Sequence, residues 1–330
     1  MKKEKKILIL LIVFLIISVF LGISLGYSSM NMYEILMTLT GNGNFKENFI
    51  IFSIRLPRVI ILLITGFSLA IAGGLLQIIT KNDLADTGII GINSGAGLFI
   101  TILYLLIPTN SEKYIYFVPI LAFLGGTFSG LLIFFFSREK TGKVNIQKLI
   151  LVGIGFSMAF SGLMVLLVSS AERSKLEFIA KWLNGNIWGN NWYFVIATLP
   201  WLLILLILTF YKIRIIDTFL LNEETALSIG VNVNKEKIIL LFISISLASI
   251  SVAIAGAISF LGLISPHISR MLVGSRAKIC FPTSMLIGAT LIIIADIIGR
   301  NILLPNGIPT GIVVALIGVP YFIYLINRKK

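Results

Sequence analysis

Long apolar runs separated by short polar segments repeat along the whole chain of 330 residues. A helix rises about 1.5 Å per residue, so about 20 apolar residues cross a hydrocarbon core of about 30 Å. The pattern therefore predicts an all-α polytopic membrane protein with about ten transmembrane helices. The expected spans lie at 7–25, 56–79, 88–107, 115–136, 147–170, 192–211, 238–256, 258–273, 281–299 and 310–326.

The first apolar run follows a head that contains Lys2, Lys3, Lys5 and Lys6, so it must be compared with a signal peptide. A signal peptide has an apolar core of about 7–15 residues followed by a small-x-small cleavage site. The run here is longer and no such site follows it, so we interpret it as a retained first helix. No Pro-, Gly- or Ser-rich linker divides the chain, and residues 1–330 are predicted to form a single transmembrane domain.

The distribution of Lys and Arg predicts the orientation, because cytoplasmic loops of membrane proteins are enriched in both. An even number of spans places both termini on the same side. With that side cytoplasmic, 19 of the 27 basic residues lie inside. The other eight lie outside: Lys46, Arg55, Arg58, Lys113, Arg173, Lys175, Lys181 and Arg300. The expected protein is therefore a multi-pass protein of the cell membrane with cytoplasmic termini.

Composition agrees with a protein dissolved in lipid, since 57% of the residues are hydrophobic, 12% are charged and the mean hydropathy is +1.02. The net charge of +13 is spread between apolar runs without a recognition motif, so no nucleic-acid partner is expected. Cys280 and His267 are the only cysteine and histidine in the sequence. We therefore expect no disulfide framework, no metal site and no cofactor, and a structural role for His267.

Two polar segments need more than a hydropathy reading. The expected outer segment, residues 171–191, carries Trp182, Trp188 and Trp192 and is typical of a helix at headgroup depth. The expected inner segment, residues 213–237, reads as a short amphipathic helix ended by Gly230. From this segment alone, a docking element and a solvated loop are equally good interpretations.

Several strings of the sequence, taken in order, resemble the FecCD permease family, which serves ATP-binding-cassette importers of iron-siderophores, haem and cobalamin. The resemblance runs over nearly the whole chain after the first span. The strings are RLPR (55–58), GFSLAIAGGLLQ (66–77), KNDLAD (81–86), GINSGAG (91–97), WLNGNIWGNNW (182–192), LLNEETALSIGV (220–231), GAISFLGLISPHISR (256–270), DIIGR (296–300) and IPTGIVVALIGVPYF (308–322). The chain departs from the family pattern where Asp83 and Thr87 replace prolines and Gly307 replaces an acid.

At the outer face, the resemblance implies that Arg55, Arg58 and Arg300 receive acidic residues of a substrate-binding protein. Arg55 and Arg58 are three apart, a spacing that shares a face on an α-helix, and a guanidinium can bind a carboxylate with two hydrogen bonds. The alternative is that they reach lipid phosphate. Asp296 lies inside a span four residues before Arg300, which predicts a structural ion pair.

At the inner face, the resemblance implies that residues 223–230 form the coupling helix that docks on an ATPase subunit. Ala226, Leu227 and Gly230 would pack in its cleft, with Glu223 and Glu224 at the rim. The resemblance also implies a cytoplasmic gate near Asn82 and Leu84, and a translocation path lined by the fifth span around Gly153 and Gly155. Dense glycines in the other spans are better explained by close helix packing.

The expected function is that of a permease subunit, not an enzyme, which moves ferric-siderophore chelates into the cytoplasm by alternating access. No phosphate-binding loop occurs, because Gly142-Lys143 lacks the other residues of that motif, so ATP hydrolysis is expected in a separate subunit. The expected partners are a second permease subunit, identical or homologous, two ATPase subunits, an extracytoplasmic substrate-binding protein and membrane lipid. Haem or cobalamin remains the alternative cargo. An ion-coupled transporter and a membrane-embedded enzyme are disfavoured because the spans lack the ionisable residues that either requires.

Overall fold

The computed structural model of the chain describes residues 2–26, 30–88, 91–106, 114–139, 144–169, 171, 173–187, 191–221, 223–302 and 307–328. These residues are almost entirely helical, and no strand occurs among them beyond an isolated bridge between Arg138 and Val144. The elements are α1 (Lys2–Ser24), α2 (Met32–Leu39), α3 (Phe45–Asn48), the π-helix η1 (Phe49–Arg55), α4 (Leu56–Thr80), α5 (Ile92–Leu106), α6 (Tyr114–Ser137), α7 (Ile146–Val168), α8 (Arg173–Leu183), α9 (Trp192–Tyr211), α10 (Ile213–Thr218), α11 (Glu223–Ser228), α12 (Val233–Ala255), α13 (Leu261–Val273), α14 (Ala277–Ile302) and α15 (Thr310–Arg328).

The all-α polytopic fold class is confirmed, whereas the number of about ten membrane-spanning helices is not. Within the described ranges, seven helices are long and apolar enough to cross a membrane: Lys3–Ser24, Phe45–Thr80, Phe117–Ser137, Ile146–Val168, Trp192–Tyr211, Val233–Ala255 and Ala277–Ile302. Two shorter apolar helices, Ile92–Leu106 and Thr310–Leu325, and the short α13 occupy the other three expected spans. The chain is thus an integral membrane protein in which two expected spans, 88–107 and 258–273, are shortened.

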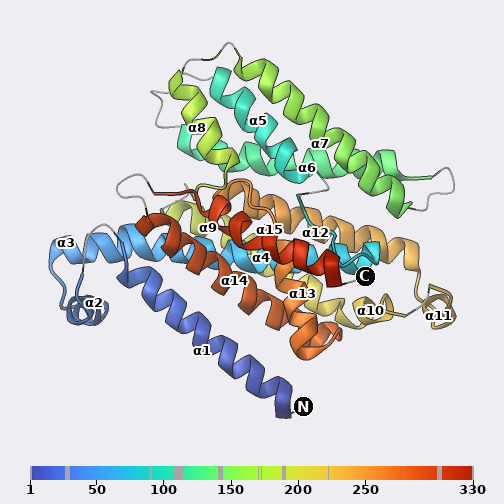
Figure 1. Ribbon diagram of the computed structural model, residues 1–330, viewed down its shortest axis with the longest axis horizontal. Helices are drawn as coiled ribbons and strands as arrows, with labels where there is room; N and C mark the ends of the chain where they lie inside the picture. Colours follow the sequence, from blue (N-terminus) through green and yellow to red (C-terminus); the bar gives the residue numbers. More distant parts are fainter. Residues whose placement is uncertain are drawn as a thin grey trace.

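Helix α4 is the centre of the fold, since it packs against α12, α13 and α14 and most of its residues are buried (Figure 1). Glycines set these crossings. A Cβ atom at Gly66 would lie 2.5 Å from the Cα of Ala289, and one at Gly73 would lie 1.9 Å from the carbonyl oxygen of Gly262. Because helices in lipid gain little from apolar burial against each other, such close backbone approach is a main source of their packing energy.

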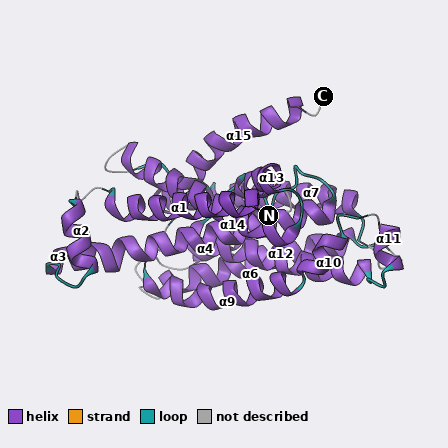
Figure 2. Ribbon diagram, turned by 90° about the horizontal axis from the view of Figure 1, so that it is seen from below, coloured by secondary structure: helices purple, strands orange, loops and turns teal. Residues whose placement is uncertain are grey.

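Helices α5, α6, α7 and α8 form a second group that lies beside this central layer (Figure 1). Helix α7 packs on α5 and α6 along one side, while Leu151, Met158, Val165 and Leu166 on its other side are each about 70% exposed. Helix α15 contacts α13 and α14 and is inclined away from the other helices toward its C-terminal end (Figure 2). These apolar surfaces are suited to lipid or to another apolar chain.

The two ends of the molecule differ in character. Helices α2 and α3 lie at one end and α11 lies at the opposite end, on whose side both chain termini are found (Figure 1). Of the tryptophans expected at headgroup depth, Trp182 at the end of α8 is instead buried, with 2% of its surface exposed. Trp192 is 41% exposed and donates a hydrogen bond to the carbonyl of Phe52, and Trp188 lies outside the described residues.

Candidate functional site

A buried carboxylate organises the end of the molecule that carries α2 and α3. Asp296, near the end of α14, is fully buried. Arg58, in the first turn of α4, grips it with two nitrogens: Nη2 lies 2.7 Å from Oδ1 and Nε lies 3.1 Å from Oδ2. Arg300 Nε lies 2.9 Å from Oδ2, and the hydroxyl of Thr310 donates to Oδ1 over 2.9 Å. The predicted Asp296–Arg300 pair is confirmed, within a larger network that joins α4, α14 and the start of α15.

The third predicted arginine completes this cluster by capping α1. Arg55 Nη1 donates to the carbonyls of Ile23 and Ser24 at 2.5 and 2.9 Å, and Arg300 Nη2 donates to the carbonyl of Gly22 at 3.1 Å. The last carbonyls of a helix lack partners and carry a partial negative charge, which cations offset. The arginine cluster, defined as Arg55, Arg58 and Arg300, therefore fixes the C-terminal end of α1 to the bundle.

The structure brings the three predicted docking residues together, but it places them in different surroundings. Arg55 is 4% exposed, whereas the side chains of Arg58 and Arg300 are 16% and 20% exposed. Arg55 is the last residue of the π-helix η1 and turns toward α1, while Arg58 turns toward α14. Two of the guanidinium groups, those of Arg58 and Arg300, contact the carboxylate of Asp296, whereas Arg55 bonds to α1. The role of the cluster in docking stays a prediction.

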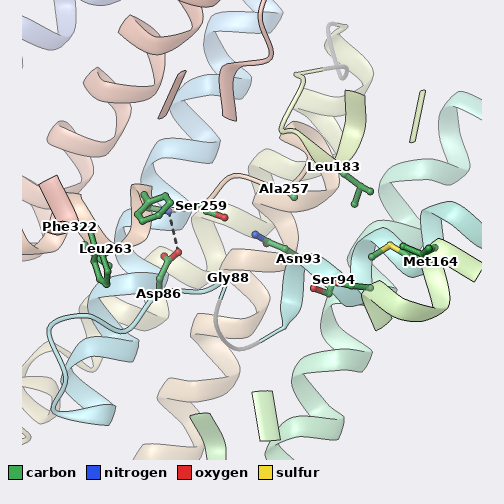
Figure 3. A pocket seen from close by; sticks show the side chains of 13 residues that line it. Asp86, Gly88, Asn93, Ser94, Met164, Leu183, Ala257, Ser259, Leu263 and Phe322 are labelled. Atoms are coloured by element: carbon green, nitrogen blue, oxygen red, sulfur yellow. Dashed lines mark hydrogen bonds between the residues drawn. The ribbon is translucent and has the colours of Figure 1, made fainter. Parts of the chain in front are cut away.

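A cavity of about 620 Å³ lies where α5, α7, α13 and α15 meet (Figure 3). Its lining is mostly apolar, with a few amide and hydroxyl groups and one carboxylate. The lining residues are Asp86, Gly88, Asn93, Ser94, Ser161, Met164, Val165, Leu183, Ala257, Ser259, Phe260, Leu263 and Phe322. Pockets of this size and character are typical small-molecule sites. No group of three or more metal-ligating side chains occurs in the described part of the chain.

Asp86 joins two irregular segments at this cavity. Its Oδ2 accepts a hydrogen bond from the backbone N–H of Phe260 over 3.2 Å (Figure 3). Phe260 has a φ of +67°, a left-handed conformation that is rare for a bulky side chain and marks local strain. Phe260 also packs edge-on against Phe322 of α15, with ring centroids 6.3 Å apart. The connection from α12 to α13 is thus held in a strained shape between Asp86 and α15.

The predicted gate residues belong to a turn that reaches the cavity at Asp86. Asn82 Oδ1 accepts from the N–H of Leu84 over 3.0 Å, and the N–H of Ala85 donates to the carbonyl of Asn82 over 3.1 Å. These bonds close a tight turn at residues 82–86, which we call the candidate gate loop. The side chain of Leu84 packs on the apolar cluster that contains Leu263, a lining residue.

The predicted path residues of the fifth span do not reach the cavity. Gly153 is buried, and its carbonyl oxygen would lie 3.3 Å from a Cβ atom at Gly91, so it serves packing. Gly155 lies on the open face of α7, where a Cβ atom would meet nothing within 4 Å. The same helix does line the cavity, one to three turns further along, through Ser161, Met164 and Val165. A path along Gly153 and Gly155 stays a prediction.

The predicted coupling segment forms the short helix α11. Ala226 is 2% exposed and faces the bundle, whereas Leu227 is 59% exposed. Gly230 has a φ of +84°, and the N–H groups of Gly230 and Val231 bond to the carbonyls of Leu227 and Ala226, which is a Schellman cap. The expected glycine cap is confirmed. The side chains of Glu223 and Glu224 lie outside the described residues.

Sequence reasoning assigned no role to most of the cavity-lining residues. Asn93, Ser94, Ser259 and Phe260 fall inside strings that carry the family resemblance, yet hydropathy placed them within two apolar spans. The available signal was polar residues next to glycine near the start of those spans. Such composition favours irregular backbone, which at membrane depth is tolerated where it is buried or lines a cavity.

Known proteins share this arrangement over the full chain. The model of the FecCD transport family matches residues 12–328. The chain belongs to this family. The Iron(3+)-hydroxamate import system permease protein FhuG of Bacillus subtilis is 36% identical over 100% of this chain and 99% of its own length. The iron-uptake system permease protein FeuC of the same organism is 38% identical over 99% and 98%.

A solved structure of a metal-chelate type ABC transporter, in an inward-facing conformation, matches with a TM-score of 0.83 and 30% identity, covering 98% of this chain and 99% of that one. Other relatives are named as permease proteins of Fe(3+)-citrate and heme-iron systems. The FecCD relatives are thus named as membrane permeases of import systems and not as enzymes. Their names differ in the iron compound carried.

Proposed function

We propose that this chain is the permease subunit of an ATP-driven importer that moves ferric-siderophore chelates across the cell membrane into the cytoplasm. The observation that carries the proposal is the cavity of about 620 Å³ in a FecCD family member, close to the candidate gate loop. Membership alone leaves the cargo open, because relatives are named for hydroxamate, citrate and heme iron.

The chemistry of the cavity supports transport without chemical change of the cargo. Apart from the carboxylate of Asp86, its polar side chains are amides and hydroxyls, such as Asn93, Ser94 and Ser259, set among apolar side chains. Hydroxyls and amides can bond to the oxygen- and nitrogen-rich rim of an organic chelate, while apolar walls accommodate its carbon frame. A carrier must also release its cargo, so a lining with few charged groups fits a path better than a storage site.

The proposed transport cycle uses both ends of the molecule. A substrate-binding protein would dock with its acidic side chains on the arginine cluster, whose guanidinium groups can bind carboxylates. Two ATPase subunits would dock on α11 of this chain and of a second permease subunit, with the exposed Leu227 in the contact. ATP binding would then move α11 and the candidate gate loop, so that the cavity opens alternately to either side. In this orientation both termini are cytoplasmic.

Uptake in cells that lack this chain tests the cargo. Loss of uptake of a labelled ferric hydroxamate, with uptake of labelled ferric citrate, haem and cobalamin unchanged, is the expected result, and the unaltered chain should restore it. Loss of haem or cobalamin uptake with normal ferric-chelate uptake would show that the chain belongs to an importer of haem or cobalamin and not of ferric siderophores. Unchanged uptake of all four compounds would contradict the importer itself.

Charge reversal tests the docking face. Arg58→Glu should abolish uptake, whereas Lys46→Glu should not, because Lys46 is an exposed basic residue of α3 outside the cluster. Arg58 also binds Asp296, so the amount of Arg58→Glu protein in the membrane is measured alongside. An acid-to-lysine change in the binding protein that restores uptake by Arg58→Glu would establish the contact. Failure of every such change would contradict docking at Arg58.

A further inference from the structure

The candidate gate loop is tied to α13 by a polar cluster that the transport model above does not use. Gln77, in the last turn of α4, donates from Nε2 to the carbonyls of Ala85 and Leu263 at 3.3 and 3.2 Å. Its Oε1 accepts a short hydrogen bond from Nη2 of Arg270, in the last turn of α13. The same Nη2 lies 3.3 Å from Oδ1 of Asp83 in the loop.

This cluster contacts the loop at the C-terminal end of α13, whereas the cavity lies at the N-terminal end of that helix. At the start of α13, Asp86 bonds to the N–H of Phe260, as described above. At its end, Arg270 binds both Gln77 and Asp83. The loop is therefore attached to α13 at both ends of the helix, and the two attachments differ in kind. The Phe260 bond is buried beside the cavity, whereas the side chain of Asp83 is 46% exposed and that of Arg270 is 16% exposed.

The Arg270 end of α13 is also bonded to the segment that leads to α11. Ser269 donates from Oγ to the carbonyl of Cys280 in the first turn of α14, over 2.6 Å. The N–H of Ala277, the first residue of α14, donates to Oδ1 of Asp217 over 2.6 Å. Asp217 belongs to α10, the helix that precedes α11. One continuous set of polar contacts thus runs from α10 through the start of α14 and the end of α13 to the loop.

Asp83 is the residue of the candidate gate loop whose carboxylate reaches Arg270. We propose that Asp83 and Arg270 form an electrostatic latch that holds the candidate gate loop shut on α13, and that Arg270 is the positioning residue through which movement of the α10–α11 segment reaches the loop. This inference rests on the proposed role of the loop as a gate.

Because the pair is partly exposed, the latch has a bounded strength and depends on salt. Exposed ion pairs are worth about a two- to five-fold change in an equilibrium, and salt at about 1 M shortens the Debye length to about 3 Å from about 10 Å at 0.1 M. A latch of this kind is weak enough to be released in each transport cycle. A buried bond such as that of Asp86 with Phe260 would not respond to salt in this way.

The single cysteine of the sequence makes a direct test possible. Cys280 is replaced by alanine, Leu84→Cys is introduced in the loop, and the rate of labelling by a neutral maleimide is measured on the assembled transporter with its ATPase subunits. In this background Asp83→Asn should raise the labelling rate without nucleotide about two- to five-fold at 0.1 M salt, and the difference should vanish at about 1 M salt. Asp83→Glu, which keeps the carboxylate, should label close to the parent rate.

A second ion pair at the α11 end provides the matched control. Lys212 Nζ lies 2.7 Å from Oε1 of Glu236, and this pair joins α9 to α12 without touching the loop. Glu236→Gln should leave labelling at Leu84→Cys unchanged. An equal rise in Glu236→Gln and Asp83→Asn, or no rise in Asp83→Asn, would overturn the latch. If the labelling rate of the Cys280→Ala, Leu84→Cys protein does not change when ATP is trapped in the ATPase subunits, the loop is not a gate, and the inference of a latch is wrong as well.

Discussion

The substitution Asp296→Asn removes the negative charge on which two guanidinium groups converge. Asp296 is fully buried, and the side chains of Arg58 and Arg300 are only 16% and 20% exposed. Removing one partner of a buried ion pair costs about 3–5 kcal/mol, because the remaining charge is left without compensation in a poorly solvated place. Both arginines keep some contact with solvent, so we expect a loss near the lower limit, about 3 kcal/mol.

Thermal unfolding of the purified chain in detergent measures this loss. Cys280 is the only cysteine of the sequence and is 3% exposed, so a dye that fluoresces on reaction with thiols reports its exposure on unfolding. A loss of about 3 kcal/mol should lower the Tm by about 4 °C in a chain of this size. Glu236→Gln is the matched control, because it leaves a single cation, Lys212, without its partner, and its Tm should fall by less.

A double-mutant cycle separates the charge effect from a general loss of packing. If the cost of Asp296→Asn comes from uncompensated arginine charge, Arg58→Gln should cost less in the Asp296→Asn background than in the parent, since it then removes a charge that no longer has its carboxylate. The expected coupling between the two changes lies in the range of about 0.5–3 kcal/mol found for residues in one network. A Tm of Asp296→Asn within about 1 °C of the parent, or strictly additive effects, would refute the reasoning.

Two further predictions concern helix contacts. Gly73→Ala should lower the yield of folded protein in fluorescence-detected size-exclusion chromatography, because its Cβ would lie 1.9 Å from the carbonyl oxygen of Gly262 and overpacking costs about 1–3 kcal/mol. The control is Gly155→Ala, whose Cβ would meet nothing within 4 Å and which should elute as the unaltered protein does. Equal yields of the two variants would contradict the packing argument. Tyr321→Phe removes the hydroxyl that lies 2.7 Å from Nδ1 of His267 and should lower the Tm by about 1.5 °C, as expected for about 1 kcal/mol. An unchanged Tm would show that this bond does not join α13 to α15.

The positions of the helices follow from hydropathy, because each expected apolar run contains a described helix. Two helices begin later than the spans expected for them. The spans expected at 88–107 and 258–273 contain helices that begin at Ile92 and Leu261. Residues before both helix starts line the cavity, where Asp86 bonds to Phe260. Irregular backbone inside a membrane needs polar partners from elsewhere in the chain, and these partners are invisible to a window of consecutive residues.

The surroundings of the arginines could be predicted only in part, because some of their partners also lie far away in the sequence. The Asp296–Arg300 pair has helical spacing within one element and was found from the sequence. The ion pair between Arg58 and Asp296 joins residues that are 238 positions apart in the sequence. Arg55, which caps α1, is the last residue of the π-helix before α4. A π-helix changes which way its last residue points, so the spacing of Arg55 and Arg58 did not reveal their different neighbours.

The partial burial of the arginine cluster bears on how strongly a docking partner can act there. Two guanidinium groups, those of Arg58 and Arg300, contact the carboxylate of Asp296, and the end of α1, which Arg55 and Arg300 cap, contributes about half a negative charge. The side chains of Arg58 and Arg300 are less than a quarter exposed. The interaction between charges grows as the effective dielectric constant falls. If an acidic side chain of a binding protein docks here, as proposed above, its attraction to these arginines should therefore exceed that of the same pair on an open surface.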